Sequence, residues 1–388
     1  MEASDTLKVY NDNITNFLLA IILVFEMLYL ILFTNSHGFL FFYIANYLAI
    51  ALFLFIPVFK RFIIYNENFR ILNLGVLTII LSLISMLFTG MTNQSFYFVY
   101  SLLFLSAVIT IQWHTNNIKL ISNLSIILLG VCLFHSISPD NYDYYGRLLL
   151  YFNNPNSTGV LMYTIFTFLL IGFVLTKRLF VKSIYIISII ASLVLLYLSG
   201  NRGSIVSAII ILIIFLIINK KVFINKTLYK IICLTFLLIP FLTVVYIQFI
   251  FNSGIGKIEL MGKDVFSGRE IVWNNAISLI SQSPLFGYGT EGSINLLGTG
   301  MHNIYVGLLM RYGLIVLVPY FILIYKLLID SYNSINSTVG RIALFGFLGV
   351  FIQQSFEETL ISGSFGLYIL QYSLLAIAYS LSKSNKIF

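Results

Sequence analysis

Apolar stretches long enough to cross a lipid bilayer recur along nearly the whole chain of 388 residues. A membrane-spanning helix needs about 17–25 such residues, and they occur at about 14–34, 38–59, 71–90, 96–112, 119–137, 157–176, 183–199, 203–218, 229–251, 303–325, 341–361 and 363–382. Charged residues make up only 9% of the chain, against about 25% in soluble domains. This pattern excludes a soluble protein. It predicts an all-α polytopic membrane protein with about twelve transmembrane helices in a single integral membrane domain, residues 1–388.

The residue types that bind metals and cofactors are sparse and scattered. Cys132 and Cys233 both lie inside apolar stretches, which argues against a disulfide, a thiolate metal site or a redox pair. The chain has no D-x-D or H-E-x-x-H motif, no Walker loop and no dinucleotide fingerprint. We therefore expect no catalytic metal and no cofactor. The basic residues behind the net charge of +8 form no stripe, so nucleic acid is not an expected partner.

The distribution of Lys and Arg predicts how the helices are oriented, because loops rich in these residues stay in the cytoplasm. With the N-terminus inside, sixteen of the 22 basic residues fall on the cytoplasmic side. The outer side then holds Arg147, Arg202, Lys257, Lys263 and Arg269. Both termini are therefore expected in the cytoplasm.

Two connecting segments, both expected on the outer side, are much longer than the others: about 138–156 and 252–302. A connection of the second length is usually functional or disordered. Within it, Ser267 and Glu270 have the S-x-x-E spacing of a capping box, and apolar residues follow at helical spacing. We expect an amphipathic helix over 268–282 that lies on the outer membrane face.

Arginines on the outer side are the most informative feature of the sequence. Arg202 precedes the stretch at 203–218, and Arg269 lies in the first turn of the expected surface helix. A guanidinium beside the backbone N–H groups and the positive end of a helix is suited to binding a phosphate. The alternative is that these arginines anchor loops to lipid headgroups or pair with outer carboxylates. Arg147 is a weaker candidate for the same role.

Candidates for acid–base chemistry lie close to the same surface. His302 and Asn303 open the stretch at 303–325, just after a Gly-rich segment. A histidine can act as a general base near neutral pH, although a single interfacial histidine is more often a hydrogen-bonding residue. The outer acid Glu291 is the other candidate for the catalytic base.

One arginine falls inside an expected span. Arg311 is nine residues into the stretch at 303–325, and a charge at that depth costs at least about 2.5 kcal/mol unless it faces a polar cavity or a carboxylate. Glu26, Glu357 and Glu358 are possible partners. A structural ion pair and a contact with substrate are both open for Arg311 and Glu357.

Several short motifs on the outer side carry a resemblance to a known family. They are Leu198-Ser-Gly-Asn-Arg202-Gly-Ser204, Ser267-Gly-Arg269-Glu-Ile-Val-Trp273, Ser283-Pro-Leu-Phe-Gly-Tyr-Gly289, and His302-Asn-Ile-Tyr305 with Gly313, preceded by Asn153-Asn-Pro-Asn156 with Gly159. In their order and spacing they resemble the O-antigen ligase and polymerase superfamily, which includes the Wzy-type polymerases of O-antigen and capsule. The resemblance covers about residues 145–315.

This resemblance implies a glycosyltransferase on the outer face of the bacterial cytoplasmic (inner) membrane. Its substrate would be a glycan carried on undecaprenyl pyrophosphate, as in lipopolysaccharide and capsule synthesis. In the ligases, arginines matching Arg202 and Arg269 are assigned to the pyrophosphate, and a histidine matching His302 to the acceptor. The chain has Asn201 where a serine is more usual. It also has Arg311 where an acidic or polar residue is common, which speaks against the ligase pattern.

We therefore predict a metal-independent polysaccharide repeat-unit polymerase that moves a growing glycan onto an incoming lipid-linked repeat unit. Two alternatives stay open. One is an O-antigen ligase that passes the same glycan to lipid A core or to a protein. The other is a flippase for lipid-linked sugars, which would need a path of intramembrane polar residues; the long outer segment favours an enzyme. A chain-length regulator and a separate flippase are expected partners.

Overall fold

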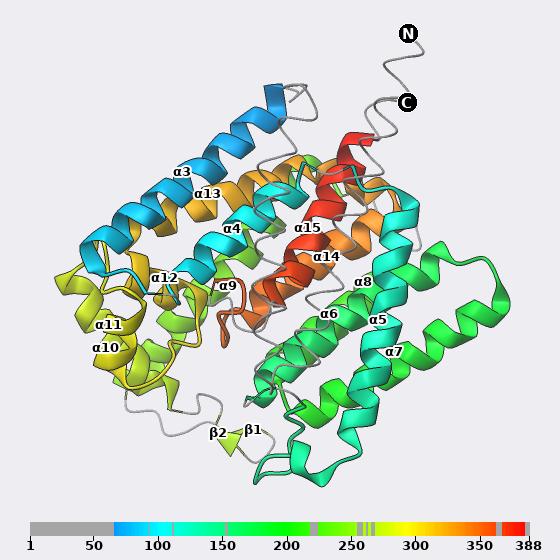
Figure 1. Ribbon diagram of the computed structural model, residues 1–388, viewed down its shortest axis with the longest axis horizontal. Coiled ribbons are helices and arrows are strands. Elements are labelled where there is room, and N and C mark those ends of the chain that lie inside the picture. The colour runs from blue at the N-terminus through cyan, green and yellow to red at the C-terminus, as the bar shows by residue number, and fades with distance from the viewer. Residues whose placement is uncertain are drawn as a thin grey trace.

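The computed structural model describes residues 66–388 except 93, 111, 151, 153, 218–223, 254–258, 261–262, 265–267, 362–366 and 385–388. The spans expected at 14–34 and 38–59 lie outside the described residues, as does Glu26. Helices dominate the described part of the chain, which supports the predicted all-α class (Figure 1).

The elements follow the apolar pattern of the sequence. The helices are α3 (Asn66–Thr89), α4 (Phe96–Val108), α5 (Thr115–Ser136), α6 (Pro155–Leu175), α7 (Leu179–Ser199), α8 (Arg202–Ile217), α9 (Lys226–Asn252), α10 (Arg269–Gln282), α11 (Thr290–Leu297), α12 (Ile304–Tyr312), α13 (Leu314–Asp330), α14 (Thr338–Gln353) and α15 (Leu367–Ser384), with short 3-10 helices η1 (Pro139–Asn141) and η2 (Tyr332–Asn336). Two short strands, β1 (Glu259–Leu260) and β2 (Lys263–Asp264), pair antiparallel.

Five of the described helices are long and apolar enough to cross a membrane: α3, α5, α6, α7 and α9. Helices α4, α8 and α14 are apolar but shorter. The described helices are thus consistent with a membrane protein, whereas they do not confirm the expected number of twelve spans.

The stretch at 303–325 is not one helix, contrary to expectation. It breaks at Gly313, whose φ of +71° ends α12 and lets α13 begin at Leu314. A Cβ on Gly313 would lie 2.1 Å from the carbonyl oxygen of Leu285, and the Leu314 N–H donates to the Pro284 oxygen at 2.9 Å. The break therefore depends on a distant loop. It places Arg311 in the last turn of α12 instead of deep inside a continuous span.

The stretch at 341–361 is also shorter as a helix than expected. Helix α14 ends at Gln353, and residues 354–361 continue as turns. The Gln354 carbonyl at this end accepts a hydrogen bond from the Ile304 N–H at 3.1 Å. Ile304, the first residue of α12, is thus hydrogen-bonded to the residue that follows the end of α14.

The buried helix α14 organises the bundle. It packs against α8, α15, α6 and α9, and nearly all of its side chains are buried. Close approach requires small residues, since a Cβ on Gly349 would lie 2.0 Å from the Tyr163 hydroxyl on α6. In Figure 1, α14 and α15 lie in the middle, with α5 to α8 on one side and α3, α10, α11 and α12 on the other.

The helix expected in the long outer segment is present as α10. Trp273 and Ala276 are completely buried in a cluster that also contains Ile247 of α9 and Val306 of α12, whereas Ile271 and Ile277 are exposed. The Trp273 indole donates to the Met301 carbonyl at 2.7 Å. Helix α10 therefore packs on protein through Trp273 and Ala276, and its location on the outer membrane face stays a prediction.

Candidate functional site

Arg202 is the first residue of α8. The turn before it begins at Gly200, with a φ of +65°. Asn201 holds the start of α8, because its side-chain oxygen accepts the Ser204 N–H at 3.0 Å. Its amide also donates to the Asn156 carbonyl at 2.8 Å. The asparagine that departs from the usual motif thus ties the arginine turn to the start of α6.

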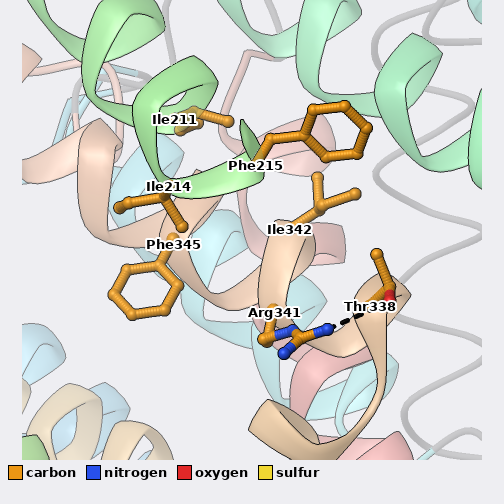
Figure 2. A pocket seen from close by; sticks show the side chains of 7 residues that line it. All are labelled: Ile211, Ile214, Phe215, Thr338, Arg341, Ile342 and Phe345. Atoms are coloured by element: carbon orange, nitrogen blue, oxygen red, sulfur yellow. Dashed lines mark hydrogen bonds between the residues drawn. The ribbon is translucent and has the colours of Figure 1, made fainter. Parts of the chain in front are cut away.

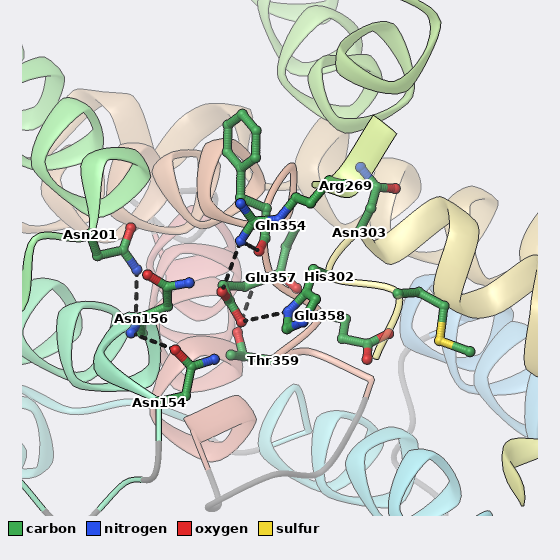
Figure 3. A network of polar contacts seen from close by, with 12 residues as sticks. Asn154, Asn156, Asn201, Arg269, His302, Asn303, Gln354, Glu357, Glu358 and Thr359 are labelled. Carbon is green, nitrogen blue, oxygen red and sulfur yellow. Dashed lines mark hydrogen bonds and ion pairs between the residues drawn. The ribbon is translucent and has the colours of Figure 1, made fainter. Parts of the chain in front are cut away.

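The Asn-rich segment before α6 supports the same turn. Asn154 caps α6 by accepting the Asn156 N–H at 2.9 Å, and Figure 3 shows Asn154, Asn156 and Asn201 in one chain of hydrogen bonds. A Cβ on Gly159 would lie 2.4 Å from the Asn201 Cβ, so only glycine allows α6 to approach so closely. Asn153 lies outside the described residues.

Arg269 is the first residue of α10, and Gly268 precedes it with a φ of +80°. Its Nη2 donates to the Phe356 carbonyl at 3.3 Å, and the guanidinium lies over the Phe356 ring, 5.4 Å from the centroid. The Nη2 is also 3.8 Å from the Glu357 Oε1. The side chain is only 14% exposed, and its buried Nε has no hydrogen-bond partner among the described residues.

The two arginines lie within electrostatic reach of each other. Burial lowers the pKa of Arg269, the Glu357 carboxylate opposes this, and the positive charge of Arg202 lowers the pKa of Arg269 further. Two helix N-termini, each starting with an arginine, therefore contribute charge to one polar region.

His302 faces the same carboxylate as Arg269. Its Nδ1 lies 3.8 Å from the Glu357 Oε2, as Figure 3 shows. Burial alone would lower the pKa of His302 and Arg269 also lowers it, but Glu357 and, to a smaller extent, Glu358 raise it, so that the pKa lies above its ordinary value of 6.5. His302 has a φ of +51°, which is uncommon for a residue with a side chain. Such local strain is often found at functional sites.

Asn303 fixes the backbone beside this histidine. Its side-chain oxygen caps α12 by accepting the Tyr305 and Val306 N–H groups at 2.9 and 3.3 Å. Its amide donates to the carbonyls of Pro240 at 3.0 Å and Ser355 at 3.1 Å. This buried residue therefore links α9, α12 and the segment after α14.

The contact with α9 shows how deep the region lies. Pro240 is twelve residues before Asn252, the last residue of α9, which corresponds to about 18 Å along the helix. The start of α8 is at the same level as the end of α14, since a Cβ on Gly203 would lie 3.7 Å from the Gln353 Cα. Asn303 therefore lies well below the Asn252 end of α9, whereas the start of α10 lies nearer to that end, since Gln248 donates to the Glu270 carbonyl at 3.0 Å.

The segment Gln353-Gln-Ser-Phe-Glu-Glu-Thr359 lies at the centre of the candidate site, and sequence reasoning named only its two glutamates. It receives hydrogen bonds from Arg269, Asn303 and Ile304. Several of its buried polar atoms have no hydrogen-bond partner among the described residues: both amide atoms of Gln353, the Ser355 hydroxyl, one Glu357 oxygen and one Glu358 oxygen. Buried polar groups in proteins are nearly always hydrogen-bonded. These atoms therefore favour a site for a polar ligand. In the sequence, the run of six polar residues in seven inside an apolar stretch could have indicated this segment.

Arg311 has a structural partner. Its Nη2 donates to the Glu358 Oε1 at 2.6 Å, and both side chains are almost completely buried. Glu358 was among the partners expected, whereas Glu357 faces Arg269 and His302 instead. The two consecutive glutamates thus interact with different cationic side chains.

Two predicted site residues are not joined to this cluster by any described contact. Arg147 packs near Gly200 but pairs with Asp143 at 2.6 Å and lies over the Tyr145 ring, so its charge is already balanced. Glu291 is exposed in the first turn of α11. Among the described contacts, none links Glu291 to His302 or to the two helix-terminal arginines.

A cavity elsewhere in the bundle is a poorer candidate. It lies between α8 and the N-terminal half of α14 and is lined by Ile211, Ile214, Phe215, Thr338, Arg341, Ile342 and Phe345 (Figure 2). Its one charged residue, Arg341, donates to the Thr338 hydroxyl at 3.1 Å. The lining is otherwise apolar and brings together no acid and base, so the cluster around Glu357 is the better candidate for a catalytic site.

Comparison with known proteins gives one finding. Residues 187–321 match the family model described as O-antigen ligase. The matched region includes Arg202, Arg269, His302 and Arg311 but ends before Glu357. A comparison with curated proteins finds no match.

Proposed function

Because the chain belongs to the O-antigen ligase/polymerase superfamily, we propose that it is a polysaccharide repeat-unit polymerase. In this role it is a glycosyltransferase that joins glycans carried on undecaprenyl pyrophosphate at the outer face of the cytoplasmic membrane. The apolar helices and the family together support a multi-pass membrane protein. The outer location of the site and the cytoplasmic termini belong to the proposal.

The observation that supports the proposal is that Arg269 and His302 face one carboxylate, that of Glu357. The start of α8, where Arg202 lies, packs beside the end of α14, four residues before this glutamate. Both arginines begin helices, where backbone dipoles also favour negative charge. A lipid diphosphate could place its phosphates beside these residues while its hydrocarbon tail stays in the bilayer.

The proposed step transfers the glycan from the diphosphate to a hydroxyl group. A bond forms between the acceptor oxygen and C1 of the donor sugar, while the bond from C1 to the pyrophosphate oxygen breaks. The leaving pyrophosphate takes the electron pair, and Arg202 and Arg269 stabilise the charge that develops on it. His302 accepts the proton of the attacking hydroxyl.

A ligase is the second candidate, and the description of the matched family model favours it. A ligase would use the same donor and the same two arginines, and it would differ only in the acceptor. Supplying the purified protein with either lipid-linked repeat units or lipid A core separates the two functions. A ladder of glycans on the lipid carrier supports the polymerase, whereas one product on the core supports the ligase.

The deciding experiment uses purified full-length protein with undecaprenyl-pyrophosphate repeat units, with and without EDTA. We expect ladder formation in both conditions, with a loss of at least about 100-fold in Arg202→Ala, Arg269→Ala and His302→Ala. Arg178→Ala is the matched control, since this exposed arginine lies at the far end of α7 from the Arg202 turn. Full activity of both site arginine variants, or translocation of the lipid without a new glycosidic bond, would refute the proposal.

A further inference from the structure

Glu357 is shared by two cationic groups. Its Oε1 lies 3.8 Å from the Arg269 Nη2, and its Oε2 lies 3.8 Å from the His302 Nδ1. The carboxylate is 7% exposed. Both separations exceed the usual length of a hydrogen bond, so neither partner holds the carboxylate tightly. Within the described part of the chain, the Oε1 atom has no hydrogen-bond partner.

The other groups around the histidine leave Glu357 as its available acid. Arg269, Glu357 and Glu358 are the charged groups that act on His302. Glu358 is bound to Arg311 at 2.6 Å, and a Cβ on Gly307 would lie 2.3 Å from its second oxygen. Glu358 is therefore confined by a short ion pair, whereas both contacts of Glu357 with cations are 3.8 Å long.

We propose that Glu357 is a positioning residue that orients His302 and couples it to the donor site. This inference rests on the proposed function, because it assigns the diphosphate to Arg269. When the diphosphate binds, its oxygens replace the carboxylate at Arg269, and Glu357 then interacts with His302 alone. A carboxylate on one ring nitrogen of a histidine fixes the tautomer and leaves the other nitrogen to act as a base.

This coupling places the proton transfer after donor binding. The acceptor hydroxyl gives its proton to the Nε2 of His302, and Glu357 stabilises the resulting imidazolium through Nδ1–H. At the same time the acceptor oxygen forms a bond to C1 of the donor sugar, while the bond from C1 to the diphosphate oxygen breaks. Without a donor, Glu357 still neutralises part of the charge on Arg269, which keeps the buried guanidinium paired.

The first test needs no substrate turnover. Diethyl pyrocarbonate modifies neutral histidine, so mass spectrometry of the peptide that contains His302 gives its titration midpoint in the full-length protein. We expect Glu357→Gln to lower the midpoint by on the order of one pH unit, and Glu357→Asp to restore most of the shift. Asp140→Asn is the control, an exposed outer acid on η1. An unchanged midpoint in Glu357→Gln overturns the proposal.

The second test measures binding of radiolabelled undecaprenyl pyrophosphate. Removing the competing carboxylate should make Glu357→Gln bind this lipid several-fold more tightly, whereas Arg269→Ala should bind it at least tenfold more weakly. Weaker binding by Glu357→Gln would contradict the exchange at Arg269. Both tests give a result even if no glycan is polymerised, so failure of the proposed function is recognised separately.

The kinetic test uses the polymerisation assay. We expect Glu357→Gln to lower kcat by about 100-fold, without an increase in KM for the donor, and to move the acidic limb of the pH profile to lower pH. Glu357→Asp should recover at least tenfold of the lost rate. A loss of kcat with an unmoved pH profile would show that Glu357 supports only the fold.

Discussion

Arg311 donates from Nη2 to Glu358 Oε1 over 2.6 Å, with side chains 6% and 11% exposed. The pair joins the last turn of α12 to the segment that follows α14. Removing one member of a buried pair leaves an uncompensated charge. We expect Arg311→Met or Glu358→Gln to lower the free energy of unfolding by about 3–5 kcal/mol, measured by denaturation in detergent.

The control for this pair is Lys326→Ala. Lys326 pairs with Asp330 at 2.8 Å, but its side chain is 44% exposed. An exposed pair contributes at most about 1 kcal/mol. Equal costs at the two pairs would contradict the structural role of Arg311.

The two asparagine caps should differ in their contribution to stability. Asn303→Ala removes a cap and two hydrogen bonds to buried carbonyls, with an expected cost of about 2–4 kcal/mol. Asn154→Ala removes one capping bond of α6 and should cost about 1 kcal/mol. Thermal unfolding of both variants measures the difference, and an equal cost would mean that Asn303 does no more than cap α12.

Glycine at the break between α12 and α13 should be essential, because of a close contact in addition to its φ. Gly313 and Gly298 both have a φ of +71°, but a Cβ on Gly298 would meet nothing within 4 Å. Gly298→Ala should cost about 1–2 kcal/mol for the left-handed conformation. Gly313→Ala adds a clash with the Leu285 carbonyl oxygen. Its ψ of −173°, against 0° at Gly298, also lies in a region essentially restricted to glycine, so the variant should cost a further ~1–3 kcal/mol. Comparing the unfolding midpoints of the two variants checks this.

The contribution of His302 to stability should depend on pH. Its pKa in the folded protein lies above 6.5: burial opposes this, and the Glu357 carboxylate outweighs it. The protonated form therefore stabilises the fold fully below about pH 6.5, and this stabilisation is lost as the pH rises through the raised value. We expect the difference in Tm between wild type and His302→Gln to shrink from acidic to alkaline pH. A difference in Tm that grows with pH would contradict the predicted stabilisation by protonated His302.

Cysteine labelling can test the orientation of the bundle. Cys132 and Cys233 are completely buried, so the background should be low. Tyr144 is 97% exposed, and Tyr144→Cys should react with an impermeant maleimide on intact spheroplasts. Arg178→Cys should react only after the membrane is opened. Labelling of both from the same side would refute the proposed topology.

Much of the helical architecture could be predicted from hydropathy. The stretch expected at 183–199 corresponds to α7 (Leu179–Ser199), and the stretch at 229–251 to α9 (Lys226–Asn252). These predictions succeed because a long apolar segment in lipid must satisfy its backbone polar groups internally, as a helix does. The same reasoning placed Arg202 and Arg269 at helix starts, where the structure has them.

Hydropathy could not reveal where a continuous apolar stretch breaks. At Gly313 the break depends on the carbonyl of Leu285, and at Gln353 on the start of α12. It also could not assign the two glutamates. Glu357 and Glu358 are neighbours in the chain, but their side chains have different partners.

The sequence alone thus determined the membrane helices and the positions of two arginines at helix N-termini, because these features depend on local composition and spacing. Only the tertiary structure decided that Arg269 and His302 share Glu357 while Arg311 binds Glu358. A carboxylate interacts with the cations nearest to it in space, and those distances are set by how α8, α10, α12 and α14 pack.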